Sequence, residues 1–298
     1  MIFSIGEILI DRFPDYERIG GAPFNFAFHL KQMGLPVRFM TRIGRDAYGR
    51  QILDMLRAHG FSREDIQIDS HHATGKVDVS LDSQGIPQFE ICTDTAYDHL
   101  DLSRVGDADL SSAQMVYFGS LSQRSPHGFR QVQLLLERID PSICAFCDIN
   151  LRPPHINPEA IESSLKKADV LKLNEDELAL ISRMLKPPRN RKEESAAWLM
   201  RSFGISRIAL TKGAHGSKII TPGESIDSPP LQDIPVVDTV GAGDAYASVL
   251  AAGLLKKFPL PGILELATEF AAYVCGLPGA IPSADDPFYD FLRRRMND

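Results

Sequence analysis

Hydrophobic and polar residues follow two repeating patterns along most of the chain. Short apolar runs suited to buried strands alternate with longer stretches whose apolar residues recur three and four positions apart, the spacing of one helix face. This alternation is typical of a mostly parallel sheet covered by helices, with the site at the carboxyl ends of the strands. The predicted strand and helix pairs are 37–43 with 47–58, 115–118 with 128–139, 143–149 with 158–167, 170–173 with 175–185, and 208–211 after a helix over 194–203.

Residues 74–91 break this alternation. Val77, Val79 and Leu81 alternate with polar residues, and a Ser-Gln-Gly turn follows them, so a hairpin with one apolar face is predicted. A further strand is predicted beside it over residues 8–13. Because such a sheet has no helices of its own, we expect it to cap a substrate or to pack on a second subunit.

Composition describes an ordinary globular protein. The 298 residues are 44% hydrophobic and 24% charged, enough for one large α/β domain or two modest ones. A net charge of −7 argues against nucleic-acid binding, and no Lys/Arg run forms a basic stripe. The early apolar stretch 3–10 is broken by Gly6 and Glu7, and no apolar run has membrane-spanning length, so neither signal peptide nor membrane is expected and the cytoplasm is predicted.

Cysteine and histidine pairs were natural candidates for a metal site. Cys144 and Cys147 have the spacing of a redox or zinc motif, but residues three apart on a predicted strand face opposite sides. Core cysteines are therefore predicted. His71 and His72 form a pair in a turn region with no obvious third ligand in the sequence, so no metal site is predicted there.

The segment Asp238-Thr239-Val240-Gly241-Ala242-Gly243-Asp244 carries the strongest sign of chemistry. A strand predicted over 234–237 runs into two glycines, and a small-residue helix begins where they end. The backbone N–H groups of residues 241–243 then converge at a helix N-terminus, which binds anions. Asp244 lies beside that site, where a carboxylate can take a proton from a hydroxyl attacking phosphorus. Alternatively, Asp244 only complements the helix dipole and the glycines only permit close packing.

A second motif lies near the N-terminus. Gly20 and Gly21 lead into a helix with Pro23 in its first turn and Gly34 just past its end. Asn25 interrupts the apolar stripe of this helix. Its amide can donate to and accept from sugar hydroxyls, or it can simply cap the helix start.

Together these motifs resemble those of the ribokinase-like (PfkB) family of carbohydrate kinases, over nearly the whole chain. Gly20-Gly21-Ala22-Pro23-x-Asn25 is similar to the N-terminal signature of the family, and the segment 238–244 to its C-terminal signature. Residues 6–11, 148–152 and 279–283 are most similar to bacterial fructokinases. The resemblance implies one α/β domain over residues 1–298, a three-layer α/β/α ribokinase-like core with a mostly parallel sheet, and a small β-sheet lid over residues 9–23 and 72–96.

The resemblance also implies an ATP-dependent kinase with a defined set of site residues. Asp244 is the expected base, and the other implied residues fall into three groups. The catalytic loop is Gly241, Ala242 and Gly243; the sugar would be held by Asp11, Gly20, Gly21, Asn25 and Arg152; and ATP would be held by Lys172, Asn174, Thr211, Gly213 and Gly216. Simpler alternatives stay open: a solvated strand end for Asp11, a surface arginine for Arg152, and a hairpin turn for residues 211–216.

Two cations are implied in the same way. Glu177 would organise Mg²⁺ through water, although Asn174 and Glu177 also have the spacing of a helix capping box. A K⁺ ion behind the anion site would be held by oxygens of Asp238, Val240, Val274, Leu277, Gly279 and Ser283. Alternatively, Asp238 caps its turn and the C-terminal loop only packs. The lid would contribute to a homodimer.

The acceptor is expected to be an unphosphorylated sugar. Residues 90–98 contain no basic side chain that could hold an existing phosphate. The same absence removes a basic lid residue that fructokinases often carry, which weakens the case for fructose. Fructose still leads, followed by ribose, 2-keto-3-deoxygluconate and nucleosides. A non-catalytic sugar or nucleotide sensor is the alternative class; a dinucleotide oxidoreductase is disfavoured because no Gly-x-Gly-x-x-Gly follows the first strand.

Overall fold

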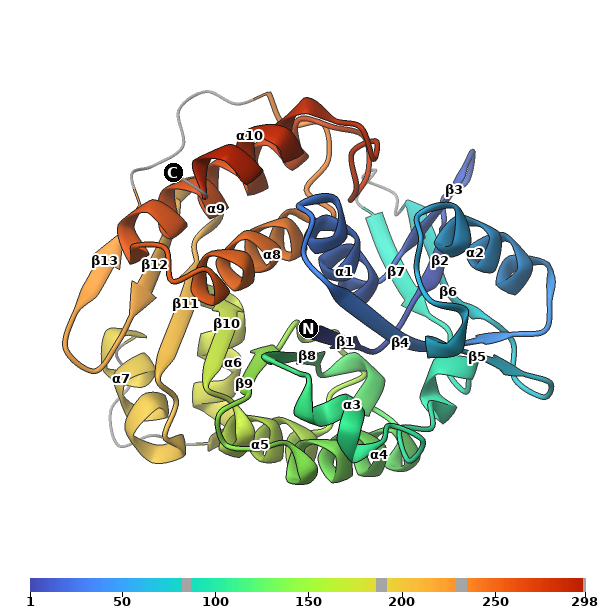
Figure 1. Cartoon of the computed structure of the whole chain (residues 1–298), viewed down its shortest axis with the longest axis horizontal. Helices are drawn as coiled ribbons and strands as arrows, with labels where there is room; N and C mark the ends of the chain where they lie inside the picture. The colour runs from blue at the N-terminus through green and yellow to red at the C-terminus, as the bar shows by residue number, and fades with distance from the viewer. Residues whose placement is uncertain (82–86, 186–191, 229–234, 297–298) are drawn as a thin grey trace.

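A nine-stranded sheet forms the centre of the computed structural model, which describes residues 1–81, 87–185, 192–228 and 235–296 (Figure 1). The strand order is β13-β12-β11-β10-β9-β8-β1-β4-β5. All neighbouring strands run parallel except β12 and β13, which are antiparallel to their neighbours. The strands are β1 Ile2–Ile5, β4 Val37–Gly44, β5 Ile66–Asp69, β8 Met115–Gly119, β9 Cys144–Asp148, β10 Val170–Asn174, β11 Arg207–Thr211, β12 Ser217–Ile220 and β13 Ser225–Asp227.

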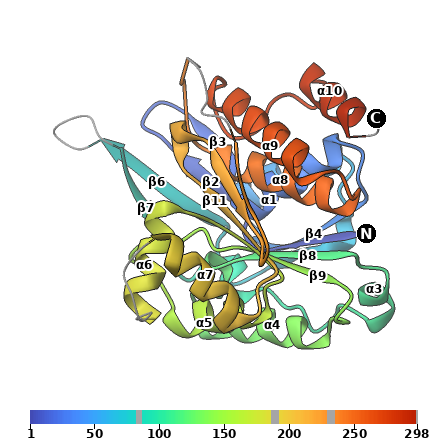
Figure 2. The ribbon, with the colours of Figure 1, turned by 90° about the vertical axis from the view of Figure 1, so that its left-hand side faces the viewer.

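Helices cover both faces of this sheet, as the view from the side shows (Figure 2). One face carries α1 Ala22–Gln32, α2 Ala47–Ala58, α8 Ala242–Leu255, α9 Leu260–Cys275 and α10 Pro287–Arg295. The other face carries α3 Asp107–Ser111, α4 Pro126–Arg138, α5 Pro158–Lys167, α6 Glu175–Leu185 and α7 Lys192–Phe203. Within the described ranges, none of these helices combines the length and the apolar character needed to cross a bilayer.

The sheet separates two hydrophobic cores, because successive strand residues point to opposite faces. Tyr117 and Phe146 pack into the core beneath α1 and α8, and their neighbours Phe118 and Cys147 pack into the opposite core. Cys144 packs against the first core and Cys147 lies in the second. The prediction that the two thiols face opposite sides is therefore confirmed, and they cannot form a shared metal site.

A separate four-stranded sheet projects from one edge of the core. Its order is β3-β2-β6-β7, with β2 Leu9–Arg12, β3 Glu17–Gly20, β6 Gly75–Leu81 and β7 Pro87–Ile91. We call these four strands the lid. Its apolar side chains, Leu9, Val77, Val79 and Ile91, form a small core with Tyr97 and Leu121 of the main body. The predicted lid range 9–23 extends slightly too far, because residues 22 and 23 already belong to α1, and the turn at 82–86 lies outside the described residues.

The predicted elements agree closely with the structure, with one clear error. The helices predicted over 47–58, 158–167 and 175–185 have those bounds. The strand predicted over 234–237 is wrong: residues 235–237 are not a strand, and Ile234 lies outside the described residues. Val236 and Val237 are 66% and 63% exposed, and the Val237 N–H donates to the carbonyl of Cys275. Pro235 has no N–H to give a strand ladder, so β-branched composition misled the prediction.

Candidate active site

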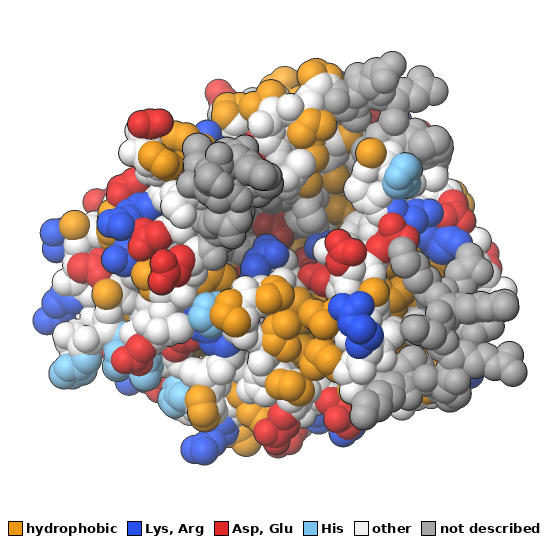
Figure 3. Space-filling model, turned by 180° about the vertical axis from the view of Figure 1, so that it is seen from behind, with side chains coloured by type: hydrophobic (Ala, Val, Ile, Leu, Met, Phe, Trp, Pro, Cys, Tyr) orange, Lys and Arg blue, Asp and Glu red, His pale blue; other side chains and the backbone are white. Residues whose placement is uncertain are grey.

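A cleft of about 1350 Å³ lies at the carboxyl ends of the central strands, with lid strands on one side. Residues that end or follow β8, β9, β10 and β11 line it, as do Leu9, Asp11, Val77 and Ile91 of the lid. The predicted catalytic and ATP-binding residues all line this cleft, and so do the predicted sugar-binding residues other than Gly20. In the space-filling view from behind, acidic and basic side chains lie in a hollow near the middle of the face, with apolar side chains beside it (Figure 3).

The N-terminus of α8 opens into the cleft. Gly241 caps this 14-residue helix with φ 79°, in the left-handed region, and a Cβ atom there would lie 2.4 Å from the Cβ of Ala280. Only glycine fits such a position without displacing a neighbour. Among the described residues, the N–H groups of Gly241 and Gly243 have no hydrogen-bond partner. These donors and the positive end of the helix dipole form a site for an anion.

Asp244 lies in the first turn of α8 and is only 7% exposed. Asn25 of α1 donates from Nδ2 to Oδ2 of Asp244 over 2.7 Å. Burial raises the pKa of Asp244 to about 6; the positive charge of Lys172 and the hydrogen bond from Asn25 act in the opposite direction. The carboxylate is therefore a base that is ionised at neutral pH and stronger than an ordinary aspartate.

Asn25 does not cap its helix. Gly21 occupies the N-cap position of α1, and no side chain makes a capping bond there. The Oδ1 atom of Asn25 is buried and has no partner among the described residues. The amide therefore holds Asp244 with one atom and leaves the other available to a hydroxyl group in the cleft.

Lys172 of β10 brings a positive charge to the same place. Its Nζ lies 3.0 Å from both carboxylate oxygens of Asp148, which also accepts a hydrogen bond from Tyr117. A Cβ atom at Gly243 would lie 2.8 Å from this Nζ, so the ammonium group adjoins the start of α8. Burial alone would lower the pKa of Lys172, but the carboxylates of Asp148, Asp244 and Glu177 together raise it. The lysine is thus held in its charged form.

Asp11 of β2 faces the same cleft from the lid. Burial raises the pKa of Asp11 to about 6, and the charge of Arg152 acts to lower it. A Cβ atom at Gly20 would lie 2.5 Å from Oδ2 of Asp11. Gly20 does not line the cleft, but it leaves room for this carboxylate, while Gly21, with φ 118°, does line it.

Arg152 follows β9 and is exposed at the cleft. Its guanidinium group has no partner among the residues that the structure describes, although its charge acts on Glu7, Asp11 and Asp244. A charged side chain that faces a cleft without a protein partner is available to a ligand.

Sequence reasoning missed Glu7 as a site residue. This side chain between β1 and β2 is 4% exposed and lines the cleft. Burial raises the pKa of Glu7 to about 7, and its Oε2 atom has no partner among the described residues. Glu7 stands in one of the motifs that carry the resemblance, and a carboxylate inside an apolar run was the available signal. The direction in which the Glu7 side chain points could not be inferred without the fold.

The opposite end of the cleft is formed by the loop between β11 and β12. Thr211, Gly213 and Gly216 all line the cleft there, and the two glycines have φ values of 57° and 80°. A Cβ atom at Gly213 would meet nothing within 4 Å. The loop therefore presents open backbone to the cleft.

Asn174 and Glu177 form the predicted capping box at the start of α6. The Asn174 N–H donates to Oε2 of Glu177, and the Glu177 N–H donates to Oδ1 of Asn174, each over 2.8 Å. Oε1 of Glu177 also accepts from the Leu151 N–H. Burial raises the pKa of Glu177. Each carboxylate oxygen retains a lone pair, so a water-mediated metal contact fits the donor set.

The residues predicted to hold K⁺ fit that ion only in part. Asp238 caps its own turn by accepting the Val240 N–H, and it also pairs with Arg18 of β3 over 3.1 Å. A Cβ atom at Gly279 would lie 3.0 Å from the same Nη1 of Arg18. The resident guanidinium thus lies beside both loops that were expected to hold the ion.

Two of the remaining members of that set already have protein partners. The Val274 carbonyl accepts the Leu277 N–H, and the hydroxyl of Ser283 donates to Asp285. Val240 lines the cleft, whereas Val274, Leu277, Gly279 and Ser283 do not.

A mostly parallel α/β/α sheet with a lid, a buried carboxylate and an anion-binding helix start defines the class of a phosphotransferase acting on a sugar hydroxyl. The chain belongs to the pfkB family of carbohydrate kinases: the sequence model of that family matches residues 2–287. The fold is therefore ribokinase-like, as predicted.

Relatives differ in the substrates that their names give. A protein of Pyrococcus horikoshii that is named as an uncharacterized sugar kinase is 28% identical, with 93% of this chain and 89% of the relative covered. Its structure with ATP has a TM-score of 0.80 at 25% identity, with 99% of this chain and all of that chain covered. A fructokinase of Klebsiella pneumoniae is 27% identical over 99% of both chains, and an ATP-dependent 6-phosphofructokinase of Thermoanaerobacterium thermosaccharolyticum is 27% identical over 96% of this chain and 91% of its own length.

Proposed function

We propose that this protein transfers the γ-phosphoryl group of ATP to a hydroxyl group of an unphosphorylated sugar, with fructose as the leading candidate. The observation that carries the proposal is the meeting of Asp244, Asn25 and the free N–H groups of α8 in one cleft. ATP as donor agrees with the ATP complex of the Pyrococcus relative. The names of several relatives favour fructose.

Asp244 serves as the general base in this proposal. The attacking sugar oxygen forms a bond to the γ-phosphorus while its proton passes to the Asp244 carboxylate, and the bond from phosphorus to the bridging oxygen breaks to release ADP. A pKa of about 6 suits this role, because the group is ionised at pH 7 yet retains basicity. The hydrogen bond from Asn25 fixes one carboxylate oxygen and leaves the other free to take the proton.

The start of α8 stabilises the charge of the transferring group. The N–H groups of Gly241 and Gly243, with the Lys172 ammonium beside them, are oriented before the reaction, so little reorganisation is needed. The loop of Thr211, Gly213 and Gly216 would hold the nucleotide with Asn174. Mg²⁺ held through water by Glu177 would neutralise phosphate charge.

The acceptor end of the cleft favours hydroxyl groups over a second phosphate. Glu7, Asp11 and Asp244 place three carboxyl groups there, and Arg152 is the cation beside them. Carboxylates and the free Oδ1 of Asn25 accept hydrogen bonds from hydroxyls. They would repel the phosphate of a phosphorylated sugar.

A coupled ADP-release assay across acceptors tests this proposal. The panel is fructose, ribose, 2-keto-3-deoxygluconate, a nucleoside and fructose 6-phosphate, the last because one relative is named a 6-phosphofructokinase. We expect the highest kcat/KM with fructose and the lowest with fructose 6-phosphate. Preference for the phosphorylated sugar would overturn the acceptor assignment, and sugar binding without turnover on any acceptor would indicate a sensor.

We also propose that K⁺ activates the enzyme, although Arg18 already pairs with one of the expected ligands of the ion. A K⁺ ion would have to share Asp238 with Arg18. Activity is titrated with KCl at constant ionic strength in a buffer free of Na⁺ and K⁺. A severalfold rise is expected if the ion binds, and a flat response would show that Arg18 leaves no room for it.

Homodimerisation through the lid and a cytoplasmic location remain predictions. Tyr16, at 44% exposure, lies in the turn between lid strands β2 and β3. Sedimentation of the wild-type protein and of Tyr16→Lys tests the dimer: a dimer that the substitution dissociates supports it, and a monomeric wild type contradicts it.

A further inference from the structure

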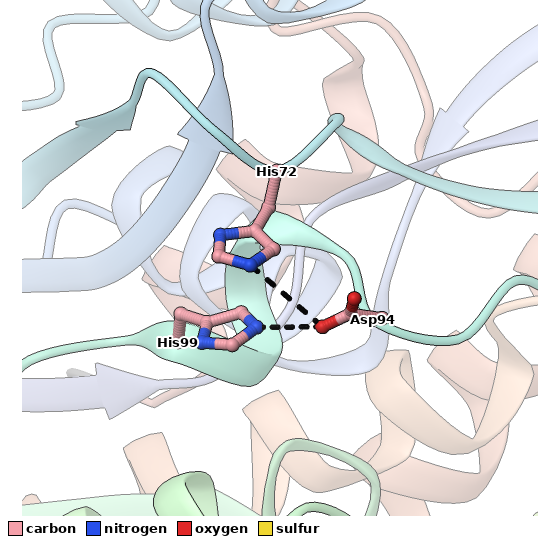
Figure 4. A group of neighbouring side chains, drawn as sticks. All are labelled: His72, Asp94 and His99. Carbon is pink, nitrogen blue, oxygen red and sulfur yellow. Dashed lines mark hydrogen bonds and ion pairs between the residues drawn. The ribbon is translucent and has the colours of Figure 1, made fainter.

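Three side chains with metal-binding atoms meet at the base of the lid, away from the cleft. His72 lies three residues before β6, Asp94 three residues after β7, and His99 ends the short helix η2, Ala96–His99. Figure 4 shows His72 and His99 one above the other, both directed at the carboxylate of Asp94. The sequence-based view that His72 lacks further ligands is therefore wrong, because the two partners become neighbours only on folding. None of the three residues lines the cleft.

The distances suit a small ion after modest movement. Nε2 of His99 lies 2.8 Å from Oδ1 of Asp94, and Nε2 of His72 lies 3.8 Å from the same oxygen. The three ligand atoms all lie within 4.8 Å of one another. A tetrahedral ion with bonds near 2.0–2.1 Å needs donor atoms about 3.3 Å apart, so shifts of about 1 Å and a tilt of the stacked rings are sufficient.

The side chains are free to make that adjustment. His72 and His99 are 28% and 31% exposed, and Asp94 is 77% exposed, so an ion can reach the group from solvent. The imidazole rings stack at 3.6 Å, and because both are part-exposed they can tilt apart without a change of rotamer.

His72 is already oriented as a ligand. Its Nδ1 lies 3.1 Å from Oδ2 of Asp69, a buried carboxylate that also pairs with Arg42 over 2.7 Å. The N–H groups of His71 and His72 also donate to Oδ1 of Asp69, over 2.7 and 2.9 Å, and fix this carboxylate beside the His72 ring. With Nδ1 directed at this carboxylate, Nε2 is the ring nitrogen of His72 that is left for a metal ion. The lone pair of His72 Nε2 then faces Asp94, the carboxylate–histidine arrangement that supports bound zinc.

We propose that His72, Asp94 and His99 bind a transition-metal ion of the Zn²⁺ type. Two imidazoles and one carboxylate favour zinc, cobalt or nickel over magnesium, and the three protein ligands leave a fourth position for water. Because His72 and Asp94 flank the β6–β7 hairpin and His99 belongs to the main body, the ion would tie both ends of this lid hairpin to the core. This inference does not depend on the proposed sugar or on catalysis.

Zinc binding to the untagged protein tests the proposal. Chelator-treated protein is dialysed against Zn²⁺ without nucleotide or Mg²⁺, and bound metal is measured by atomic emission; Co²⁺ supplies a visible spectrum that reports tetrahedral coordination. We expect one tightly bound ion in the wild type and at least tenfold weaker binding in His72→Gln and His99→Gln. His71→Gln is the matched control, since His71 is exposed and outside the group, and it should bind like the wild type.

Metal binding tests the site, and hydrogen exchange tests whether the ion ties the lid hairpin to the core. Equal binding by the wild type and the two variants, with metal-free thermal stability unchanged, would overturn the site. A site that serves as a tie should also slow amide hydrogen exchange in β6 and β7 when Zn²⁺ is added. Zinc binding without slower exchange in β6 and β7 would support the metal site but contradict the proposal that the ion ties the hairpin to the core.

Discussion

At the scale of single residues, the site is defined by carboxyl groups whose pKa values burial raises toward neutrality. Glu7, Asp11 and Asp244 have pKa values raised to about 7, 6 and 6, chiefly by loss of hydration. A protein selected only for stability would not bury three such groups around one cleft. Their presence is the electrostatic mark of a functional site.

Asp244→Asn should abolish most of the activity and stabilise the fold. We expect kcat to fall by about 10²–10⁴, because the general base is lost, while ATP affinity changes little. Since the folded-state pKa of Asp244 is raised from 3.8 to about 6, ionising it costs stability, a cost that is absent below pH 3.8 and complete above about pH 6. The asparagine variant should therefore be more stable than the wild type at pH 8, by about 1–3 kcal/mol, and equal to it near pH 4.

Steady-state kinetics and thermal unfolding at the two pH values measure these effects. Near wild-type turnover would show that another group is the base. Lower stability of the variant at pH 8 would show that the ionised carboxylate of Asp244 stabilises the fold.

Asn25→Ala should shift the pH dependence of activity. The hydrogen bond from Asn25 stabilises the ionised form of Asp244, so its loss should raise the pKa of that base. For the wild type, kcat/KM should fall as the pH drops through about 6; for the variant this fall should begin at a higher pH. The measurement is kcat/KM across the full pH range for both proteins. If the fall at low pH begins at the same pH in the variant and only KM is higher, Asn25 binds the sugar but does not act on the pKa of Asp244.

At the scale of elements, the start of α8 depends on Gly241, which no residue with a side chain can replace without strain. Gly241 has a positive φ, and its missing Cβ makes room for Ala280 of the C-terminal loop. The glycines of this segment predicted a helix start correctly. The preceding strand was mispredicted because Val236 and Val237 suggest a buried strand but stand exposed after a proline. Local composition cannot show which apolar residues a fold leaves exposed.

Gly241→Ala tests this account of the helix start against a matched control. Both Gly241 and Gly204 have positive φ, at 79° and 74°, but a Cβ at Gly204 would meet nothing within 4 Å. Each alanine should cost about 1–2 kcal/mol of left-handed strain. Only Gly241→Ala should cost a further 1–3 kcal/mol or so from the clash, and only it should lower kcat. Equal losses of stability in urea unfolding would contradict the clash.

At the scale of the whole molecule, one sheet joins the chain from β13 to β5 and both of its faces are covered. Sequence periodicity predicted this architecture and the bounds of α2, α5 and α6, because amphipathic spacing is a local property. It could not predict that Asn25 contacts Asp244, 219 positions away, that Arg18 pairs with Asp238, or that His72 meets His99. Those contacts depend on how distant elements pack.

A continuous sheet should unfold as one unit. Trp198 of α7, the single tryptophan, packs on one core, while α8 and α9 lie over the other. We expect its fluorescence and the far-ultraviolet circular dichroism to follow the same thermal transition, since separate halves would melt separately. Two transitions seen by the two probes would contradict a single domain over residues 1–298.

The central claim is that this cleft transfers a phosphoryl group from ATP to a sugar hydroxyl through Asp244. Phosphorus-31 nuclear magnetic resonance of a reaction with ATP, Mg²⁺ and fructose tests it most directly, with the wild type and Asp244→Asn compared at pH 8. The account predicts ADP and a sugar phosphate ester in equal amounts for the wild type, and almost none for the variant. Inorganic phosphate in place of the ester, or equal ester formation by both proteins, would contradict it.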